Sequence, residues 1–186
     1  MRKAIRKLPL VSKVTCSGSV PGEEVAMFLS NRRTHDALKQ NRLYEMLSCD
    51  PDYMDAYGLE LVAGRGFSED YGDDVNKLVI NETAARTLGY TDYESVIGEE
   101  ISVETIEEPM QVIGVVKDYH QQALSKNYTP IMLFHKDKID WIPQRYISIV
   151  MKPGDSLELV SQISEIWTTY FADSSFDYFF LDQFYD

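Results

Sequence analysis

The side chains with the most chemical potential stand together directly after an apolar run. Residues 112–116 read VIGVV, and residues 117–120 are Lys, Asp, Tyr and His, each able to exchange a proton or form hydrogen bonds. In a hydrolase, Asp118 could orient His120 as a general base at the end of a strand. Neighbouring residues of an extended chain point to opposite faces, so these four cannot share one pocket. We therefore favour a buried strand over 112–116 and a turn in which Asp118 accepts hydrogen bonds from nearby backbone N–H groups.

An acidic stretch, EDYGDDVN at 69–76, could hold a cation. Asp70, Asp73, Asp74 and Asn76 offer oxygen ligands, but their spacing is not that of an EF-hand loop, and the terminal bidentate glutamate is missing. We expect a solvated loop here, with a calcium site as the alternative.

The two cysteines, Cys16 and Cys49, lie far apart and outside any Cys-x-x-Cys or Cys/His metal spacing. We expect two half-buried thiols, and a disulfide between neighbouring strands stays open for an oxidising compartment. The chain has no Walker A, GxGxxG, GxSxG or HExxH motif, and its three histidines are scattered. We predict no catalytic, cofactor-binding or metal-binding residues and no cofactor.

The elements that position these residues are of mixed type. Apolar alternation and turn residues predict strands, and the predicted strands span 11–16, 27–33, 42–50, 59–64, 77–81, 95–104, 110–116, 131–134, 146–152 and 176–186. Helices are predicted over 2–7, 50–58, 82–88 and 155–171.

Capping residues set the predicted helix ends. Asp50 is the expected N-cap of the second helix, with Pro51 at its first position and Gly58 as its C-terminal stop. Asn81 and Gly89 should close the two ends of the third helix.

The longest predicted helix carries the clearest pattern. Asp155 and Glu158 form an expected capping box. Its core stripe is predicted to comprise Val160, Ile163, Trp167 and Tyr170.

This order of elements predicts an α+β fold with a split βαβ, ferredoxin-like layer. The layer would use residues 1–74 plus 144–186, and its closing strand would be the aromatic segment at the end. Residues 75–143 would form an inserted, smaller β-rich subdomain with one helix.

Composition limits the classes of partner. The chain has 186 residues and a net charge of −12, which repels phosphate backbones, so we expect no nucleic-acid binding. The basic stretch MRKAIRK is expected to be a solvated helix face, with a membrane-surface role as the alternative. No apolar run approaches the roughly 20 residues of a membrane span, and no signal peptide is evident. We expect either a cytosolic protein or a piece of a longer one.

Several segments in this order resemble a known family, the MacB-like periplasmic core domain of FtsX/MacB-type ABC-transporter permeases. The resemblance extends from about residue 8 to the end, and it rests on SGSVPGE (17–23), LVAGRGF (61–67), LVINETAARTLGY (78–90), IGEEI (97–101), VIGVVKDYHQQALSKNYTPIMLF (112–134) and FDYFFLD (176–182). Within these motifs Asn81 and Gly89 cap a helix, Gly64 and Gly98 permit tight backbone paths, and Pro130 opens a strand.

The resemblance implies a periplasmic domain of an inner-membrane permease, flanked by transmembrane helices. The fold would be a porter-like α+β subdomain with an inserted sabre-like subdomain, without a catalytic centre. It would couple ATP-driven helix movement to export, lipoprotein release or regulation of periplasmic partners.

The partners implied are the cognate ABC ATPase, reached through the transmembrane part, and a second permease copy or second periplasmic domain. A membrane-fusion adaptor or another periplasmic protein is a further candidate, and loops 68–76 and 135–145, including Trp141, are candidate contact surfaces. Two alternatives stay open: a free-standing periplasmic ligand-binding protein, and a hydrolase that uses Asp118 and His120.

Overall fold

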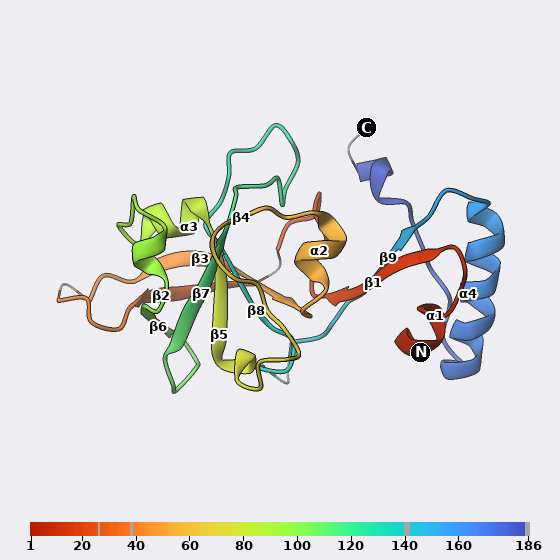
Figure 1. Cartoon of the computed structure of the whole chain (residues 1–186), viewed down its shortest axis with the longest axis horizontal. Coiled ribbons are helices and arrows are strands. Elements are labelled where there is room, and N and C mark those ends of the chain that lie inside the picture. Colours follow the sequence, from red (N-terminus) through yellow and green to blue (C-terminus); the bar gives the residue numbers. More distant parts are fainter. Residues whose placement is uncertain (26, 38, 140–141, 185–186) are drawn as a thin grey trace.

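A mixed β-sheet organises the computed structural model, which describes residues 1–25, 27–37, 39–139 and 142–184 (Figure 1). Trp141 therefore lies outside the described residues. The strands are β1 Val11–Ser17, β2 Phe28–Arg33, β3 Arg42–Cys49, β4 Leu61–Gly64, β5 Lys77–Asn81, β6 Glu100–Val103, β7 Met110–Val116, β8 Ile131–His135 and β9 Tyr146–Met151. The helices are α1 Arg2–Ile5, α2 Tyr53–Tyr57, α3 Glu82–Thr87 and α4 Ser156–Tyr170, with short 3-10 helices at Asp74–Asn76, Glu94–Val96 and Leu181–Phe184.

Most of the sheet closes on itself. The order β2-β6-β7-β5-β8-β3 returns to its start because β3 also pairs with β2. The β5–β7 and β3–β8 pairs are parallel and the other pairs of this ring are antiparallel. Strand β4 adds to the outer edge of β7. The predicted α+β class is confirmed, and we call this part the strand ring.

Alternation along the strands gives the ring two apolar faces. Tyr44 and Met46 of β3 belong to one buried cluster, together with residues of β5, β7, β8 and α3. Leu47 and Cys49 face the opposite side and pack beneath α2 with Tyr53. Because both faces are covered, strands such as β7 and β8 are apolar along nearly their whole length.

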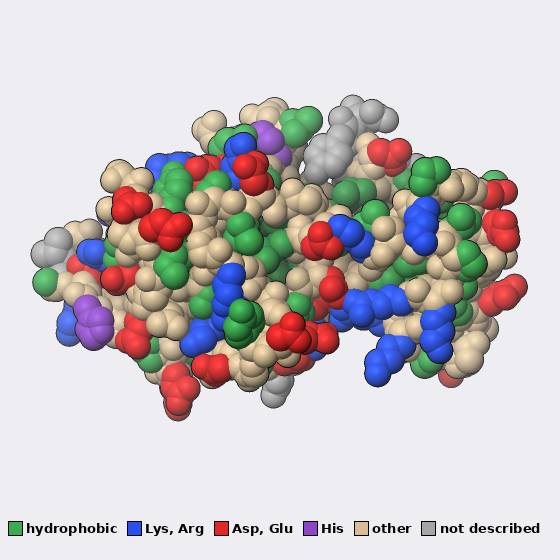
Figure 2. All heavy atoms as spheres, in the orientation of Figure 1, with side chains coloured by type: hydrophobic (Ala, Val, Ile, Leu, Met, Phe, Trp, Pro, Cys, Tyr) green, Lys and Arg blue, Asp and Glu red, His purple; other side chains and the backbone are tan. Residues whose placement is uncertain are grey.

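The remaining two strands form a ribbon that leaves the ring. Strand β1 joins β3 only at the Ser17–Cys49 pair, and its other edge pairs with β9 from Val11 to Ser17. Helices α1 and α4 cover the ribbon, where Ile5, Leu159 and Ile163 form a third, smaller core. Figure 2 shows basic side chains gathered near α1 and acidic ones along the outer side of α4.

Two predicted helix features differ in detail. The N-cap residue of α2 is Asp52, two positions after the predicted Asp50, but its side chain makes no capping hydrogen bond. The buried Asp50 side chain still accepts from the Asp52 N–H at 3.1 Å. The core stripe of α4 runs through Leu159, Ile163 and Ile166. The prediction was right at Ile163, one position late at Val160 and Trp167, and wrong at Tyr170, which is exposed. The predicted ends of α3 are confirmed: the Asn81 side chain accepts from the Ala84 N–H, and Gly89 has φ +97°.

The predicted closing strand is absent from the described residues. Residues 176–180 form no ladder, and Leu181–Phe184 is a 3-10 helix. In a split βαβ layer this strand would pair with the free edge of β1. That edge is already occupied: Asp50 accepts from the Cys16 N–H and Arg6 donates to the Val14 carbonyl. Charged side chains take the place that a strand would fill.

Gly64 allows β4 to approach β7 closely, as predicted for a tight backbone path. Its φ is +65°, and a Cβ at this position would lie 2.2 Å from the Ile113 carbonyl oxygen. We expect Gly64→Ala to lower the free energy of unfolding by at least about 2 kcal/mol in urea denaturation. Gly72→Ala is the matched control, since nothing lies within 4 Å of its added Cβ. Equal losses in both variants would contradict this account of Gly64.

Candidate functional site

The side chains of the polar quartet after β7 have separate partners and do not converge on one point. Asp118 accepts from the Thr83 N–H and the Thr83 hydroxyl, both at 2.8 Å, and forms an ion pair with Arg86. The predicted turn with nearby N–H groups was therefore wrong, because these partners lie 32–35 residues away in α3. A carboxylate at the start of a helix is favourable, so Asp118 fixes α3 to the end of β7.

His120 is not oriented by Asp118. Its ring packs against Tyr128, with 4.7 Å between ring centroids, and no hydrogen bond joins it to Asp118 among the described residues. Tyr119 is partly buried against the cluster under α2, with its hydroxyl inside, and burial raises the pKa of its phenol, so it stays protonated at neutral pH. Lys117 points the other way, to Glu60 at 3.2 Å. The hydrolase arrangement is not assembled.

The other two histidines lie elsewhere. His135 is nearly buried at the end of β8, and burial lowers the pKa of its imidazole. His35 is exposed, 3.7 Å from Glu100. Within the described residues no three His, Cys, Asp or Glu side chains are grouped closely enough to hold a metal ion.

The acidic loop is closed by an internal ion pair. Arg65 donates two hydrogen bonds to Asp74, at 2.7 and 2.8 Å, and the Ser68 N–H donates a third at 2.8 Å. Burial acts to raise the pKa of Asp74, but these contacts outweigh it and lower the pKa overall. Asp73 pairs with Lys77, so the two central carboxylates of the proposed calcium ligands already have protein partners.

The cysteines are free in the structure. Because Ser17 is the register partner of Cys49, Cys16 stands one position away and its side chain points to the opposite face of the sheet. Burial raises the pKa of both thiols, and nearby Asp50 adds to the effect.

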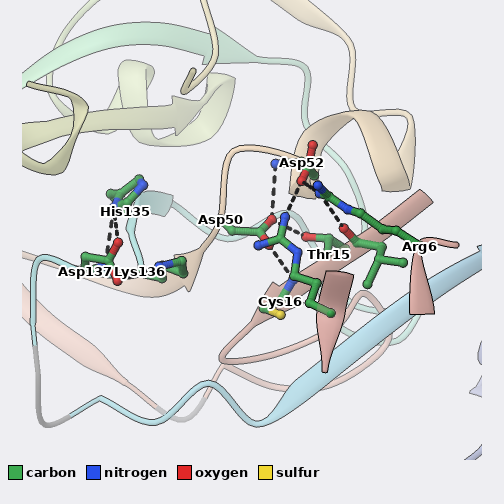
Figure 3. A network of polar contacts seen from close by, with 10 residues as sticks. Arg6, Thr15, Cys16, Asp50, Asp52, His135, Lys136 and Asp137 are labelled. Carbon is green, nitrogen blue, oxygen red and sulfur yellow. Dashed lines mark hydrogen bonds and ion pairs between the residues drawn. The ribbon is translucent and has the colours of Figure 1, made fainter. Parts of the chain in front are cut away.

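A buried carboxylate lies where ring and ribbon meet (Figure 3). Asp50 is fully buried and accepts from the Thr15 hydroxyl at 2.6 Å, the Cys16 N–H at 2.8 Å and the Asp52 N–H at 3.1 Å. Arg2 completes its shell with an ion pair at 2.8 Å. Both oxygens are satisfied, as burial of a charge requires.

A second, exposed layer surrounds that carboxylate. Arg2 of α1 and Arg6, the C-cap residue of that helix, both pair with Asp52. Lys13 of β1 pairs with Asp55 of α2 at 2.7 Å. We call Arg2, Arg6, Asp50 and Asp52 the junction clamp. Sequence reasoning assigned Asp50 to a helix cap and missed this role, although the i, i+4 arginines and the i, i+2 aspartates were a usable signal.

A second buried carboxylate lies under the loop that follows β7. Glu45 of β3 is 2 % exposed, and its Oε1 accepts from Gln122 Nε2 at 2.8 Å. Burial raises its pKa, neighbouring Glu24 adds to the rise, and hydrogen bonds from Thr129 and Gln122 oppose it. Gln121 fixes the same loop by donating to the Val20 carbonyl at 2.7 Å.

A groove beside the start of β7 is shallow and open. It has a volume of about 370 Å³ and lies beside Gly64, Gly98 and Ile113. Its only charged residue, Arg65, is already bound to Asp74. The groove therefore lacks the convergent polar groups expected of a small-molecule site.

These features agree with a comparison of the sequence with known families. The family model for the MacB-like periplasmic core domain matches residues 3–165. The chain belongs to this family. No curated protein matches the sequence at a significant level.

Solved structures show that the MacB-like fold is shared. The periplasmic region of MacB from Actinobacillus actinomycetemcomitans is 18% identical, with a TM-score of 0.61 over 91% of this chain and 72% of that one. The extracellular domain of the noncanonic ABC-type transporter YknZ from Gram-positive bacteria is 17% identical, with a TM-score of 0.66 over 93% and 83%. A domain assigned to a permease of Porphyromonas gingivalis is 21% identical, with a TM-score of 0.64 over 90% and 74%.

The family motifs occupy structural positions in this MacB-like domain. Gly64 and Gly98 both have positive φ, as their predicted backbone role requires. Pro130 precedes β8, and its carbonyl accepts from the Glu45 N–H at 2.9 Å. In the described residues no helix has the length and apolar character needed to cross a membrane.

The free cysteines of the MacB-like domain give a direct test of the sheet register. We expect the folded protein to form no internal disulfide under oxidation, because Cys16 and Cys49 point to opposite faces. Thiol titration should show slow reaction at Cys16 and none at Cys49 until denaturant is added. The Cys16→Ser variant is the control and should react only after unfolding. A native disulfide detected by mass spectrometry would contradict the register.

Glu45 predicts a pH dependence of stability. Because its folded-state pKa is raised, its contribution to stability is present below the unfolded pKa and is lost as pH rises through the folded pKa. Glu45→Gln, which keeps an acceptor for Gln122, should be more stable than the wild type at pH 7, and the difference should shrink towards pH 4. Exposed Glu108→Gln is the control. Urea denaturation across this pH range measures both, and a destabilised Glu45→Gln at pH 7 would refute the argument.

Proposed function

We propose that this domain is the non-catalytic, extracytoplasmic part of an FtsX/MacB-type ABC-transporter permease. It couples ATP-driven movement of transmembrane helices to export, lipoprotein release or regulation of periplasmic partners. Its family membership and the unassembled Asp118–His120 pair support this role. ATP hydrolysis is assigned to a separate cytoplasmic subunit or domain.

The observation that carries the proposal is the junction clamp. Coupling requires that a displacement of α1 be transmitted to the rest of the domain. Arg2 and Arg6 of α1 are tied to Asp50 and Asp52, which lie between β3 and α2. Separating Arg2 from Asp50 would leave a buried carboxylate without its counter-charge, which is strongly unfavourable. The clamp therefore makes α1 and the strand ring move together.

The partners follow from this location. They are the cognate ABC ATPase, reached through the transmembrane part, and a second permease copy or second periplasmic domain. A membrane-fusion adaptor or another periplasmic protein is a further candidate, and the loops 68–76 and 135–145 are proposed contact surfaces.

The proposed subdomains are a porter-like part, 1–74 plus 144–186, and an inserted sabre-like part, 75–143. The third apolar core, formed by α1, α4, β1 and β9, supports the first. The pairing of β5, β7 and β8 with one another supports the second. Three strand pairs, β3–β8, β2–β6 and β4–β7, join the two parts within one sheet.

The coupling role is tested in the complete permease. We expect Arg2→Ala to abolish most transport in cells while ATP hydrolysis continues, because α1 is released from Asp50. The isolated domain should lose about 2 kcal/mol of unfolding free energy through the lost charged hydrogen bond. Lys3→Ala, an exposed change on the same helix, is the matched control, and Arg2→Lys should restore part of the transport.

Two results would contradict the proposal. The first is normal transport by an Arg2→Ala permease that is present at normal abundance and shows the expected loss of domain stability. The second is a complete gene in which no transmembrane helices flank residues 1–186, which would refute the permease role itself.

A further inference from the structure

The C-terminal part of the chain carries a connected group of aromatic rings at the surface. Trp167 contacts Phe171 and Phe176, with ring centroids 4.7 and 6.0 Å apart. Phe176 stacks on Tyr178 at 5.7 Å, and Tyr178 meets Phe180 edge-on at 5.8 Å. Exposed Tyr170 ends α4, directly before Phe171. We call these five rings together with Tyr170 the aromatic tail surface: Trp167, Tyr170, Phe171, Phe176, Tyr178 and Phe180.

This surface is only partly needed for the fold. Phe176 packs against the core under α4, but Tyr170 is 54 % exposed, Tyr178 52 % and Phe171 44 %. Contiguous exposed aromatic area of this kind is unusual on a soluble domain and marks an interaction site. Aromatic side chains also dominate the energetics of protein interfaces.

The charged residues of this part of the sequence are all acidic. Seven acidic residues and no lysine or arginine follow Lys152. None of the six acids between Asp155 and Asp182 forms an ion pair with another described residue. In the nearest basic segment, Arg2 and Arg6 are paired with Asp50 and Asp52, which leaves exposed Lys3 and Lys7 as the cations closest to these six acids.

This combination selects the chemistry of a partner. Aromatic faces attract cations, and carboxylates beside them strengthen that attraction. A surface of anionic lipid or a second copy of this acidic face would be repelled. We propose that the aromatic tail surface binds a cationic amphipathic helix of a partner protein, whose apolar side chains cover the rings while its lysines or arginines meet the surrounding carboxylates. This goes beyond the coupling role and does not depend on it.

The test uses the 186-residue chain and a labelled amphipathic helix of about 18 residues built from leucine and lysine. Fluorescence anisotropy should show binding that weakens as salt rises from about 50 to about 500 mM. Tyr170→Ser combined with Tyr178→Ser should raise the Kd by about tenfold or more, because both exposed rings are lost. A glutamate–leucine peptide with the same apolar face should not bind.

Tyr71→Ser is the matched control, since Tyr71 is 55 % exposed in the acidic loop and lies far along the chain from α4. It should leave the Kd unchanged within about twofold.

The proposal is overturned if Tyr71→Ser weakens binding as much as the double variant, since the peptide would then be attracted by the net charge of the protein. The proposal is also overturned if the wild type does not bind the peptide, or if the acidic peptide binds equally well. It is overturned as well if the double variant still binds the peptide but loses dimer formation or binding to vesicles. Because no transport is measured, these outcomes leave the coupling proposal untouched.

Discussion

The arrangement of this domain depends on one buried charge, the carboxylate of Asp50. Strand β1 leaves the ring after a single pair with β3, so its backbone groups at that edge lack a neighbouring strand. The Asp50 side chain accepts from one of those groups and the Arg6 side chain donates to another, and Arg2 balances the buried charge of Asp50. An uncompensated carboxylate there would cost several kcal/mol, so α1, β1 and α2 must meet at this point.

The two halves on either side of this junction are built differently. The strand ring has two covered faces and is closed by the β2–β3 pair, so apart from β4 its strands present few free edges. The ribbon has only β1 and β9, and it relies on α1 and α4 for a core centred on Ile5, Leu159 and Ile163. A two-stranded ribbon is marginal without such packing. The junction therefore joins a self-supporting part to one that is held by its helices.

The polar side chains that suggest chemistry serve this construction instead. Asp118 attaches α3 to β7, and Asp74 with Arg65 closes the acidic loop. The partners of Asp118 lie 32–35 residues away, so its role cannot be recognised from its neighbours, whereas Arg65 lies only nine residues before Asp74. The surface features left without an internal role are the exposed rings and unpaired acids of the C-terminal part, which is where we place a partner.

Most of the fold could be predicted from the sequence, because its strands and helix ends depend on residues that lie close together in the sequence. Alternating apolar residues marked the strands from 11–16 to 146–152, and Asn81, Gly58 and Gly89 set helix ends through bonds and dihedral angles within a few residues. The ordered motifs also sufficed to indicate the family.

The sequence could not determine the features that depend on which strand edges and which charged side chains come together. The aromatic segment at 176–180 has the pattern of a strand, but a strand requires a free partner edge, and at β1 that edge is occupied by Asp50 and Arg6. Asp50 itself reads locally as a helix cap, and only the approach of α1 and β1 makes it the buried centre of the junction. The sequence determined the elements by short-range geometry, whereas the tertiary structure decided their edges and ion pairs, since these depend on residues tens of positions apart.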